Sequence, residues 1–525
     1  MLQPRSCLGR ATARQPPLRP PGGPRRRHAR RLAATSSSAS TPASLPPFPP
    51  PGAPAATVTA WERDATRTVA KFMLPTAAMP LADPLLSLVD TAAVGRTCPP
   101  EALAALAPNI QVFTFWGYLL SGLTAAALRE VSGRLAEGDG LGADRLASAA
   151  VALAMGVGLV AGGLTLSCGR AMLAATGASK ALTAAGLGYC RVRAAGTPLV
   201  LTAAVCQALL LARGQPRAPL AWAGVQVAAN VAGDAALVWG AGWGLTGAAA
   251  ATVAAQAIGT AGLARAVCAG GAGAGVPSVA GMAAAFRPLA PGGGGASPAA
   301  ALLATVLPIT AVYALKMGAY WLIQGAAASL PVDLLAAHVP VFAAWNLAAF
   351  ALTPLEAAAV RFCLKDPNAD PVKASALIRV VLVRCGGALG LAGGLAAAAA
   401  AAWGGPAFSP APALWPLMAS LAPQAGLATL ACAADVAATG VLVASGRPRA
   451  VVVSMAGALA AVVAFRVAVI AAAPPGLARL GLVWWALVLF FVARAVGSVG
   501  GLWWGGLLGG GRRREEEWGA AGTTS

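Results

Sequence analysis

Charged side chains are scarce in this chain of 525 residues. Only 11% of the residues are Asp, Glu, Lys or Arg, whereas 58% are apolar, and the mean hydropathy is +0.69. An ordinary soluble domain carries about 25% charged residues. A soluble protein of this length would form several domains, and the sequence has too few charges to coat their exteriors. The composition therefore predicts a membrane protein with many spans and excludes a disordered, collagenous or coiled-coil chain.

Metal-binding and catalytic patterns are also missing. The chain has only two histidines, His28 and His338, and its nine cysteines form no Cys-x-x-Cys pair, which argues against a zinc site. It has no Gly-rich loop ending in Gly-Lys-Ser/Thr, no Gly-x-Ser-x-Gly elbow and no catalytic triad. These absences predict a protein that is not an enzyme and holds no metal or cofactor.

The first 60 residues lack both acidic side chains and lysine. They contain nine arginines, many prolines and the serine run Ser36–Ser38, and the first carboxylate is Glu62. An Arg-rich, Ser-rich, acid-free start without a continuous apolar core is typical of an organellar transit peptide. Prolines within 10–31 oppose the amphipathic helix of a mitochondrial presequence, which favours a plastid leader over residues 1–60. A disordered cytosolic tail is the alternative.

Apolar stretches long enough to cross about 30 Å of hydrocarbon recur from Val69 onward. With both termini on one side, the turns and tail of that side carry 16 Lys and Arg residues against 6 on the other. This bias places both termini on the positive side, which is the stroma in a plastid. Since the leader and the loops account for the net charge of +20, a nucleic-acid partner is not expected. The twelve predicted spans are 69–89, 103–127, 147–169, 184–211, 218–239, 244–268, 299–325, 333–358, 378–402, 414–444, 449–472 and 479–505.

The chain also contains an internal repeat. The turn Arg213-Gly214-Gln215-Pro216-Arg217-Ala218 returns 232 positions later as Ser445-Gly446-Arg447-Pro448-Arg449-Ala450, and the first spans of the two halves are separated by nearly the same distance. The repeat predicts a six-helix lobe over residues 65–269, a Gly/Pro-rich linker over 270–297, a second six-helix lobe over 298–506 and a disordered tail over 507–525. Twofold repeats around a central cavity are typical of transporters.

Several segments together resemble the multidrug and toxic compound extrusion (MATE) family. They are the stretch Leu85–Gly95 (LLSLVDTAAVG), the Arg213-Gly214 turn, Asn230–Asp234 (NVAGD) and Gly247–Thr252 (GAAAAT). The resemblance covers residues 65–505 and is greatest to the DinF-like branch, which includes plant chloroplast-envelope members. It implies twelve helices in two lobes around a shared cavity, and export of organic solutes against H+ or Na+.

The first lobe contains a candidate site for the coupling cation. An ionisable group at the centre of a membrane helix costs at least about 2.5–3.5 kcal/mol, so such residues are functional candidates. Asn230 and Asp234 are four residues apart and share one helix face. The resemblance implies that they join Asp90 and Thr252 in a cation or proton site. A helix-end role for Asp90 and a local Asn230–Asp234 hydrogen bond are the alternatives. Asp83 lies two turns before Asp90 in the first span, whose prolines leave backbone carbonyls without hydrogen-bond partners. It is a candidate residue of the cavity that could organise these carbonyls.

The second lobe differs from the family pattern. Asp435 resembles the acid of a Na+ site in the NorM-type branch, but Lys316 occupies the position of the glutamate that the site also uses. Lys316 could pair with Asp435, bind an anionic substrate, or extend to an interface. Tyr320 and Gln324 are predicted to line the cavity, with plain packing as the alternative. His338 and Arg494 match recurrent family positions, and the expected roles are structural, with Arg494 capping a helix end.

The sequence therefore predicts an all-α polytopic carrier in the chloroplast envelope. It would act as a monomer and exchange H+ or Na+ for a small organic solute, with Lys316 favouring an organic anion. A lipid-linked oligosaccharide flippase of the same superfamily should show extra spans and a strongly cationic cavity, and neither is evident. A scaffold that has lost transport is a further alternative, against which the joint presence of Asp90, Asn230 and Asp234 argues.

Overall fold

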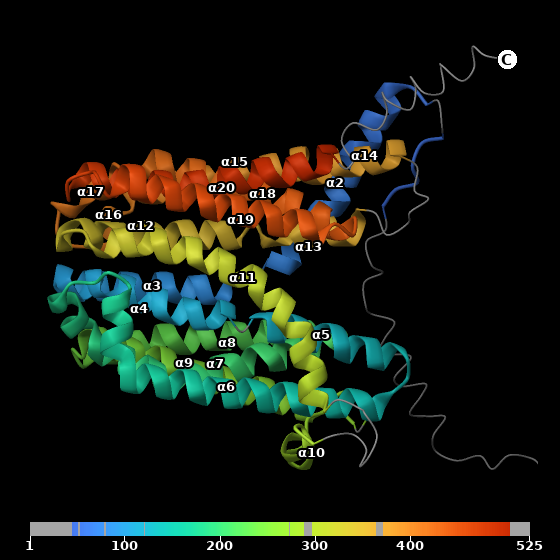
Figure 1. Ribbon diagram of the computed structural model, residues 1–525, viewed down its shortest axis with the longest axis horizontal. Helices are drawn as coiled ribbons and strands as arrows, with labels where there is room; N and C mark the ends of the chain where they lie inside the picture. Colours follow the sequence, from blue (N-terminus) through green and yellow to red (C-terminus); the bar gives the residue numbers. More distant parts are fainter. Residues whose placement is uncertain are drawn as a thin grey trace, which may run out of the picture. The chain divides into compact units, whose positions relative to one another are not determined.

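The computed structural model describes residues 45–50, 53–77, 80–119, 121–271, 273–287, 297–363 and 371–504, and this part of the chain is almost wholly helical (Figure 1). The predicted tail, most of the predicted leader and part of the predicted linker lie outside it. The N-terminal half contains α2 (Ala55–Ala77), α3 (Ala82–Thr97), α4 (Pro100–Leu119), α5 (Ser121–Ala136), α6 (Gly140–Ala175), α7 (Lys180–Ala212), α8 (Arg217–Asp234), the π-helical turn η2 (Ala235–Gly240) and α9 (Gly244–Cys268). The short helix α10 (Val279–Ala284) follows. The C-terminal half contains α11 (Pro298–Ala328), α12 (Val332–Phe350), α13 (Thr353–Phe362), α14 (Pro371–Arg379), the π-helical turn η3 (Val380–Cys385), α15 (Gly386–Trp403), α16 (Gly405–Phe408), α17 (Leu414–Ala419), α18 (Ala422–Ala444), α19 (Pro448–Phe465), the π-helical turn η4 (Arg466–Ile470) and α20 (Leu477–Trp504).

Within the described residues, nine helical stretches are long and apolar enough to cross a membrane, or ten if the bent pair Pro298–Leu307 and Thr310–Ala328 counts as one span. The predicted spans 69–89 and 218–239 are not among them. These two spans carry Asp83 with Asp90 and Asn230 with Asp234. The first is divided between two helices, of which α3 has only 16 residues, and polar side chains such as Asn230 and Asp234 lower the hydropathy of the second.

The predicted boundaries of the first span are wrong. Instead of one helix over 69–89, α2 ends at Ala77 and α3 begins at Ala82, with Pro80 between them. Proline removes a backbone donor and clashes with the preceding turn, so the helix breaks there. Residues 55–60 are helical, so the predicted disordered leader also extends too far.

The first helix of each half packs against the other half. The helices α6, α7, α8 and α9 pack on one another, as do α15, α18, α19 and α20. In contrast, α2 packs on α13, α14 and η3 of the C-terminal half, whereas α11 packs on α4, α5 and α6 of the N-terminal half as well as on α19. Figure 1 shows α11 passing from one group of helices to the other, and α2 lying beside α14. The predicted repeat aligns α2 with the start of α11, but α11 also packs on α19 and α20 of its own half.

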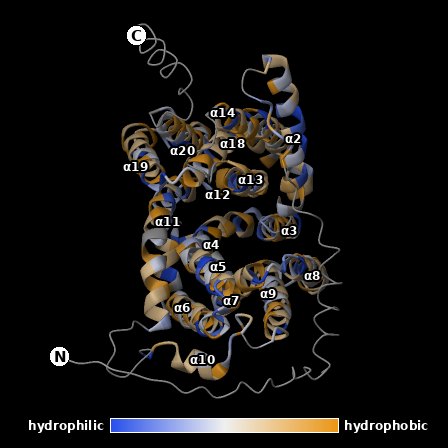
Figure 2. Cartoon of the chain, turned by 90° about the vertical axis from the view of Figure 1, so that its right-hand side faces the viewer, coloured by the Kyte–Doolittle hydropathy of each residue, from blue (hydrophilic) through white to orange (hydrophobic). Residues whose placement is uncertain are grey.

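Helix α2 is amphipathic and docks through one stripe. Trp61, Ala65, Val69 and Met73 recur every fourth residue and are buried, as expected for a helix that covers a surface with one face. Arg63, Asp64, Arg67 and Lys71 are exposed. Figure 2 shows hydrophilic residues along α2, whereas the helices beside it are predominantly apolar.

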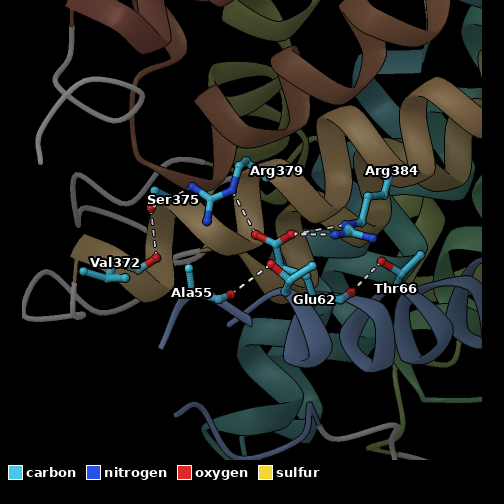
Figure 3. Close-up of polar contacts among 8 residues, drawn as sticks. Ala55, Glu62, Thr66, Val372, Ser375, Arg379 and Arg384 are labelled. Atoms are coloured by element: carbon cyan, nitrogen blue, oxygen red, sulfur yellow. Dashed lines mark hydrogen bonds and ion pairs between the residues drawn. The ribbon is translucent and has the colours of Figure 1, made fainter. Parts of the chain in front are cut away.

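The docked helix is fixed by a carboxylate that bridges two arginines (Figure 3). Arg379 Nε donates to Glu62 Oε1 at 2.9 Å, and Arg384 donates to Glu62 Oε2 through NH2 at 2.8 Å and Nε at 3.2 Å. The Glu62 side chain is only 9% exposed. Removing its charge would leave both guanidinium groups without their anionic partner, so this contact orients α2 on the C-terminal half.

Glu62→Gln is expected to loosen α2 without unfolding the membrane helices. Hydrogen bonds between charged groups contribute about 1.5–3 kcal/mol, so trypsin cleavage after Arg63 and Arg67 should accelerate by about tenfold or more. Quantitative limited proteolysis of the full chain in nanodiscs measures this. Asp64→Asn on the same helix is the control, because the exposed Asp64–Arg67 pair should contribute little. Equal cleavage rates in both variants would contradict the docking role of Glu62.

Candidate functional site

Three helices of the N-terminal half bring the predicted cation-site residues together. Thr252 Oγ1 on α9 donates to Asp90 Oδ2 on α3 at 2.9 Å, and Asn230 Nδ2 on α8 donates to Thr252 Oγ1 at 3.4 Å. Asp234 lies one helical turn after Asn230 on α8. All four side chains are at most 5% exposed. The acids therefore lie inside the bundle rather than at a membrane interface.

The backbone around Asp234 explains how α8 approaches α9 so closely. A Cβ on Gly233 would lie 2.8 Å from the Cβ of Ala251, so only glycine fits without a shift at this crossing. This contact places Asp234 beside the helix that carries Thr252. Immediately after Asp234 the helix widens into η2, and single π-helical turns inside α-helices frequently mark functional sites.

The cluster has more acceptor oxygens than donors. Among the described residues, no donor hydrogen bonds to Asp90 Oδ1, Asn230 Oδ1 or either carboxyl oxygen of Asp234, although all four atoms are buried. Buried polar atoms of this kind require a partner. Carboxylate, amide and hydroxyl oxygens are the ligands that hard cations prefer. Two adjacent carboxyl groups can also share a proton. The residues present thus fit either coupling cation.

Two residues of α7 complete the surroundings of this cluster and were missed by the sequence analysis. Tyr189 is buried within electrostatic reach of Asp90 and Asp234. Arg193, which the loop count treated as a turn residue, lies inside α7, where its guanidinium stacks over Phe113 at 5.4 Å and acts on Asp90. Its position within the predicted span 184–211 was the available signal, because charged residues inside membrane helices are rare and costly. Asp83 has an exposed side chain in the first turn of α3, and no hydrogen bond joins it to the cluster.

Asp435, the acid of the C-terminal half, pairs with Arg494 and not with Lys316. Asp435 Oδ2 on α18 lies 2.9 Å from Arg494 NH1 on α20, and both side chains are buried. Thr439 Oγ1 donates to Asp435 Oδ1 at 3.3 Å, and Ser454 Oγ donates to the carbonyl of Arg494 at 2.8 Å. The pair between Lys316 and Asp435 does not form, because Arg494 already neutralises this carboxylate. Arg494 lies within α20 rather than capping its end.

Lys316 faces aromatic rings instead. Its Nζ lies 4.7 Å from the ring centroid of Tyr118 and 5.8 Å from that of Tyr320. Cation–π contacts of this kind contribute about 0.5–2 kcal/mol and leave the ammonium free to bind an anion. No carboxylate of the described residues forms an ion pair with it.

A pocket of about 490 Å³ lies between the two halves. It contains the predicted residues Tyr320 and Gln324, and also His338, which the sequence analysis had assigned a structural role. Its polar side chains are uncharged, and aromatic rings form much of the wall. The lining residues are Ala107, Ile110, Gln111, Thr114 and Phe115 of α4, Met317, Tyr320, Trp321 and Gln324 of α11, and His338, Val339 and Phe342 of α12.

One end of the interface between the halves is tightly closed. A Cβ on Gly95 of α3 would lie 2.1 Å from the carbonyl oxygen of Phe408 of α16, so any other residue would push the halves apart there. Arg96 NH1 next to it donates to the carbonyl of Pro406 at 3.4 Å. The helix that carries Asp90 is therefore one of the helices through which the two halves touch.

Comparison with known proteins finds a family match within the N-terminal half. Residues 75–236, which contain Asp90, Asn230 and Asp234, match the MatE family model. The match covers less than half of the chain, and it agrees with the resemblance seen in the sequence.

A curated relative comes from Arabidopsis thaliana. It is named Protein DETOXIFICATION 47, chloroplastic, and is 29% identical over 204 residues. The alignment covers 38% of this chain and 36% of the relative, so the chain matches little more than a third of that protein's length.

Solved MATE structures share the fold. A multidrug resistance MATE family transporter of the MOP superfamily, in its inward-facing conformation, superposes with a TM-score of 0.61 at 16% identity over 86% of this chain and 99% of that one. A MOP superfamily transporter from Pyrococcus furiosus gives a TM-score of 0.58 at 16% identity over 84% and 96%. The predicted class, an all-α multi-pass membrane protein with the MATE fold, is confirmed, although the count of twelve spans is not reproduced in full.

Proposed function

We propose that this protein is a MATE-type secondary active transporter that exports an organic solute across a plastid membrane in exchange for H+ or Na+. The observation that carries the proposal is the buried group Asp90, Asn230 and Asp234, in which four acceptor oxygens lack donors. A scaffold would gain nothing from these costly groups. The plastid location is supported by the Arg-rich leader and by the chloroplastic relative.

The placement of Asp90 suggests how cation binding is coupled to movement of the two halves. Coupling requires that a ligand bind two conformations unequally. Asp90 lies on α3, whose other contacts include α12 and α16 of the C-terminal half. A proton or Na+ bound at Asp90, Asn230, Asp234 and Thr252 would cancel repulsion between carboxylates and tighten α3 against α8 and α9. The lobes would then rock between states that open the pocket to either side.

The solute proposed for the pocket has an aromatic ring and an anionic group. The ring would stack among Phe115, Tyr320, Trp321 and Phe342, which line the pocket. Tyr320 also contacts Lys316, so a carboxylate at the edge of such a solute would lie near the free ammonium. Aromatic carboxylates are the simplest solutes with both features.

Counterflow in proteoliposomes tests the proposal. Vesicles containing the purified chain and internal benzoate should exchange it for labelled external benzoate, and an imposed pH or Na+ gradient should drive accumulation. Accumulation that follows only one gradient identifies the coupling cation. Exchange no faster than in empty vesicles, across a panel of aromatic anions, would favour the scaffold instead.

Lys316→Ala is expected to lower benzoate uptake by about tenfold, because a hydrogen bond to a charged group contributes about 1.5–3 kcal/mol. Uptake of benzamide, which has the same shape and no charge, should change by less than about twofold, and Lys316→Arg should retain most benzoate uptake. Initial rates in the same vesicles measure these effects. If Lys316→Ala leaves benzoate uptake unchanged, the organic anion is the wrong solute class.

A further inference from the structure

We propose that Trp484, acting through His338, fixes the side-chain amide of Gln324 so that its NH2 group donates into the pocket. The pocket would therefore favour solutes with an acceptor oxygen over cationic solutes of the same shape. This inference relies on the proposed function only for the assumption that the pocket holds the solute. Trp484 is a positioning residue in this scheme, since it does not line the 490 Å³ pocket.

The first step is the bond between Trp484 and His338. Trp484 Nε1 on α20 donates to His338 Nδ1 on α12 at 3.0 Å, and the two side chains are 1% and 2% exposed. An indole N–H can only donate, so Nδ1 must accept and cannot carry a proton. The neutral ring then carries its proton on Nε2. Trp484 thereby selects one of the two histidine tautomers.

The second step is the bond between His338 and Gln324, through which the histidine tautomer sets the orientation of an amide in the pocket wall. His338 Nε2 lies 2.9 Å from Gln324 Oε1. Because Nε2 carries the proton, it donates, and the carbonyl end of Gln324 must point toward the histidine. The amide NH2 of Gln324 is left facing away from the histidine, and no described residue accepts a hydrogen bond from it. With the other tautomer, Nε2 would accept, and the Gln324 amide would turn its NH2 inward and its oxygen toward the solute.

The amide of Gln111 on the opposite wall is oriented the other way. Gln111 Nε2 donates to the backbone carbonyl of Trp321 at 3.2 Å, which leaves Gln111 Oε1 without a partner among the described residues. The pocket thus offers a donor from α11 and an acceptor from α4. The orientation of the Gln111 amide is set by a backbone carbonyl, whereas that of the Gln324 amide is set by the side chains of His338 and Trp484.

The packing around the relay keeps it rigid. The ring centroids of His338 and Trp484 are 5.6 Å apart, and His338 stacks on Phe342 at 5.6 Å. A ring held on both sides cannot rotate to exchange its nitrogens without opening the core. The donor character of Gln324 is therefore a property of the folded protein and does not need the solute to induce it.

The experiment measures binding of three isosteric probes to the full chain in nanodiscs, without any ion gradient. The probes are benzoate, which only accepts, benzamidinium, which only donates, and benzamide, which does both. We expect the wild-type protein to bind benzoate about tenfold or more tightly than benzamidinium. Trp484→Phe removes the N–H but keeps a ring, so the Gln324 amide can turn, and this ratio should fall toward one. Benzamide affinity should change by less than about twofold, because either amide orientation satisfies it.

Two further variants separate positioning from packing. Trp485→Phe is the matched control, because the neighbouring Trp485 side chain is 43% exposed and outside the relay, and it should leave the ratio unchanged. In a Gln324→Ala background, Trp484→Phe should have no further effect on the ratio, since the relay acts through that amide. A ratio that survives Trp484→Phe, or a loss of affinity equal for all three probes, would overturn the inference. Loss of gradient-driven transport with an intact binding ratio would instead contradict only the proposed function.

Discussion

Replacing Asp90 by asparagine is expected to abolish gradient-driven accumulation of solute while the protein stays folded. Asparagine preserves the size of the side chain and can still accept the hydrogen bond from Thr252, but it cannot bind a proton and gives the cluster one negative charge fewer. Coupling between two ligands typically corresponds to about 5–150-fold in affinity. Removing it should lower accumulation by that factor, to the level of empty vesicles.

Asp83→Asn is the matched control for this experiment. The same substitution is made on the same helix, but Asp83 is exposed and no hydrogen bond joins it to Asp90. We expect accumulation within about twofold of the wild type. The measurement is uptake of labelled benzoate against imposed pH and Na+ gradients, with circular dichroism of the same preparations to verify the fold. Full accumulation by the Asp90 variant would move the coupling site away from the N-terminal half.

The second large effect is expected from Arg494→Met. Asp435 is wholly buried, and Arg494 is its ion-pair partner at 2.9 Å. Removing one member of a buried ion pair leaves an uncompensated charge and typically costs about 3–5 kcal/mol of stability. Thermal and chemical unfolding in detergent should show a loss of this size. The double variant Asp435→Asn with Arg494→Met removes both charges and should recover most of it.

The exposed pair Asp64–Arg67 provides the comparison for the buried one. Its two side chains are 61% and 79% exposed, so Arg67→Met should cost no more than about 1 kcal/mol. A stability loss for Arg494→Met as small as for Arg67→Met would show that Asp435 is not charged in the folded protein. A double variant no more stable than the single one would show that packing by the arginine stem, rather than its charge, stabilises the second half.

Spacing predicted one pair of the candidate cation site, and the family resemblance implied its other two residues. Asn230 and Asp234 share a helix face because they are four residues apart, and the structure adds Asp90 and Thr252 to the same cluster. Their role in cation binding remains a prediction, as does the orientation of the termini. The count of spans was less reliable, because apolar length does not separate a lipid-facing helix from one whose polar residues are buried between other helices. For this reason the sequence predicted 69–89 and 218–239 as spans like the others.

The pairings of charged and polar side chains in the second half could not be predicted from the sequence. A Lys316–Asp435 pair was one of three alternatives for Lys316, whereas Arg494 lay in the last predicted span and was expected to cap its end. Which of two cations neutralises a buried acid depends on how α11, α18 and α20 face one another. The same holds for Trp484 and His338, which are 146 residues apart.

The sequence by itself determined that this chain enters a membrane repeatedly and which acids lie within its apolar stretches, and its internal repeat predicts two related halves. These properties depend on composition and on spacing within single helices, where neighbours are set by the helical period. Only the tertiary structure decided that α2 belongs to the surface of the second half, through a contact between Glu62 and Arg379 that spans 317 residues. It also decided which hydrogen-bonding groups face the pocket. Such contacts depend on how whole helices cross, and no local pattern specifies the crossing.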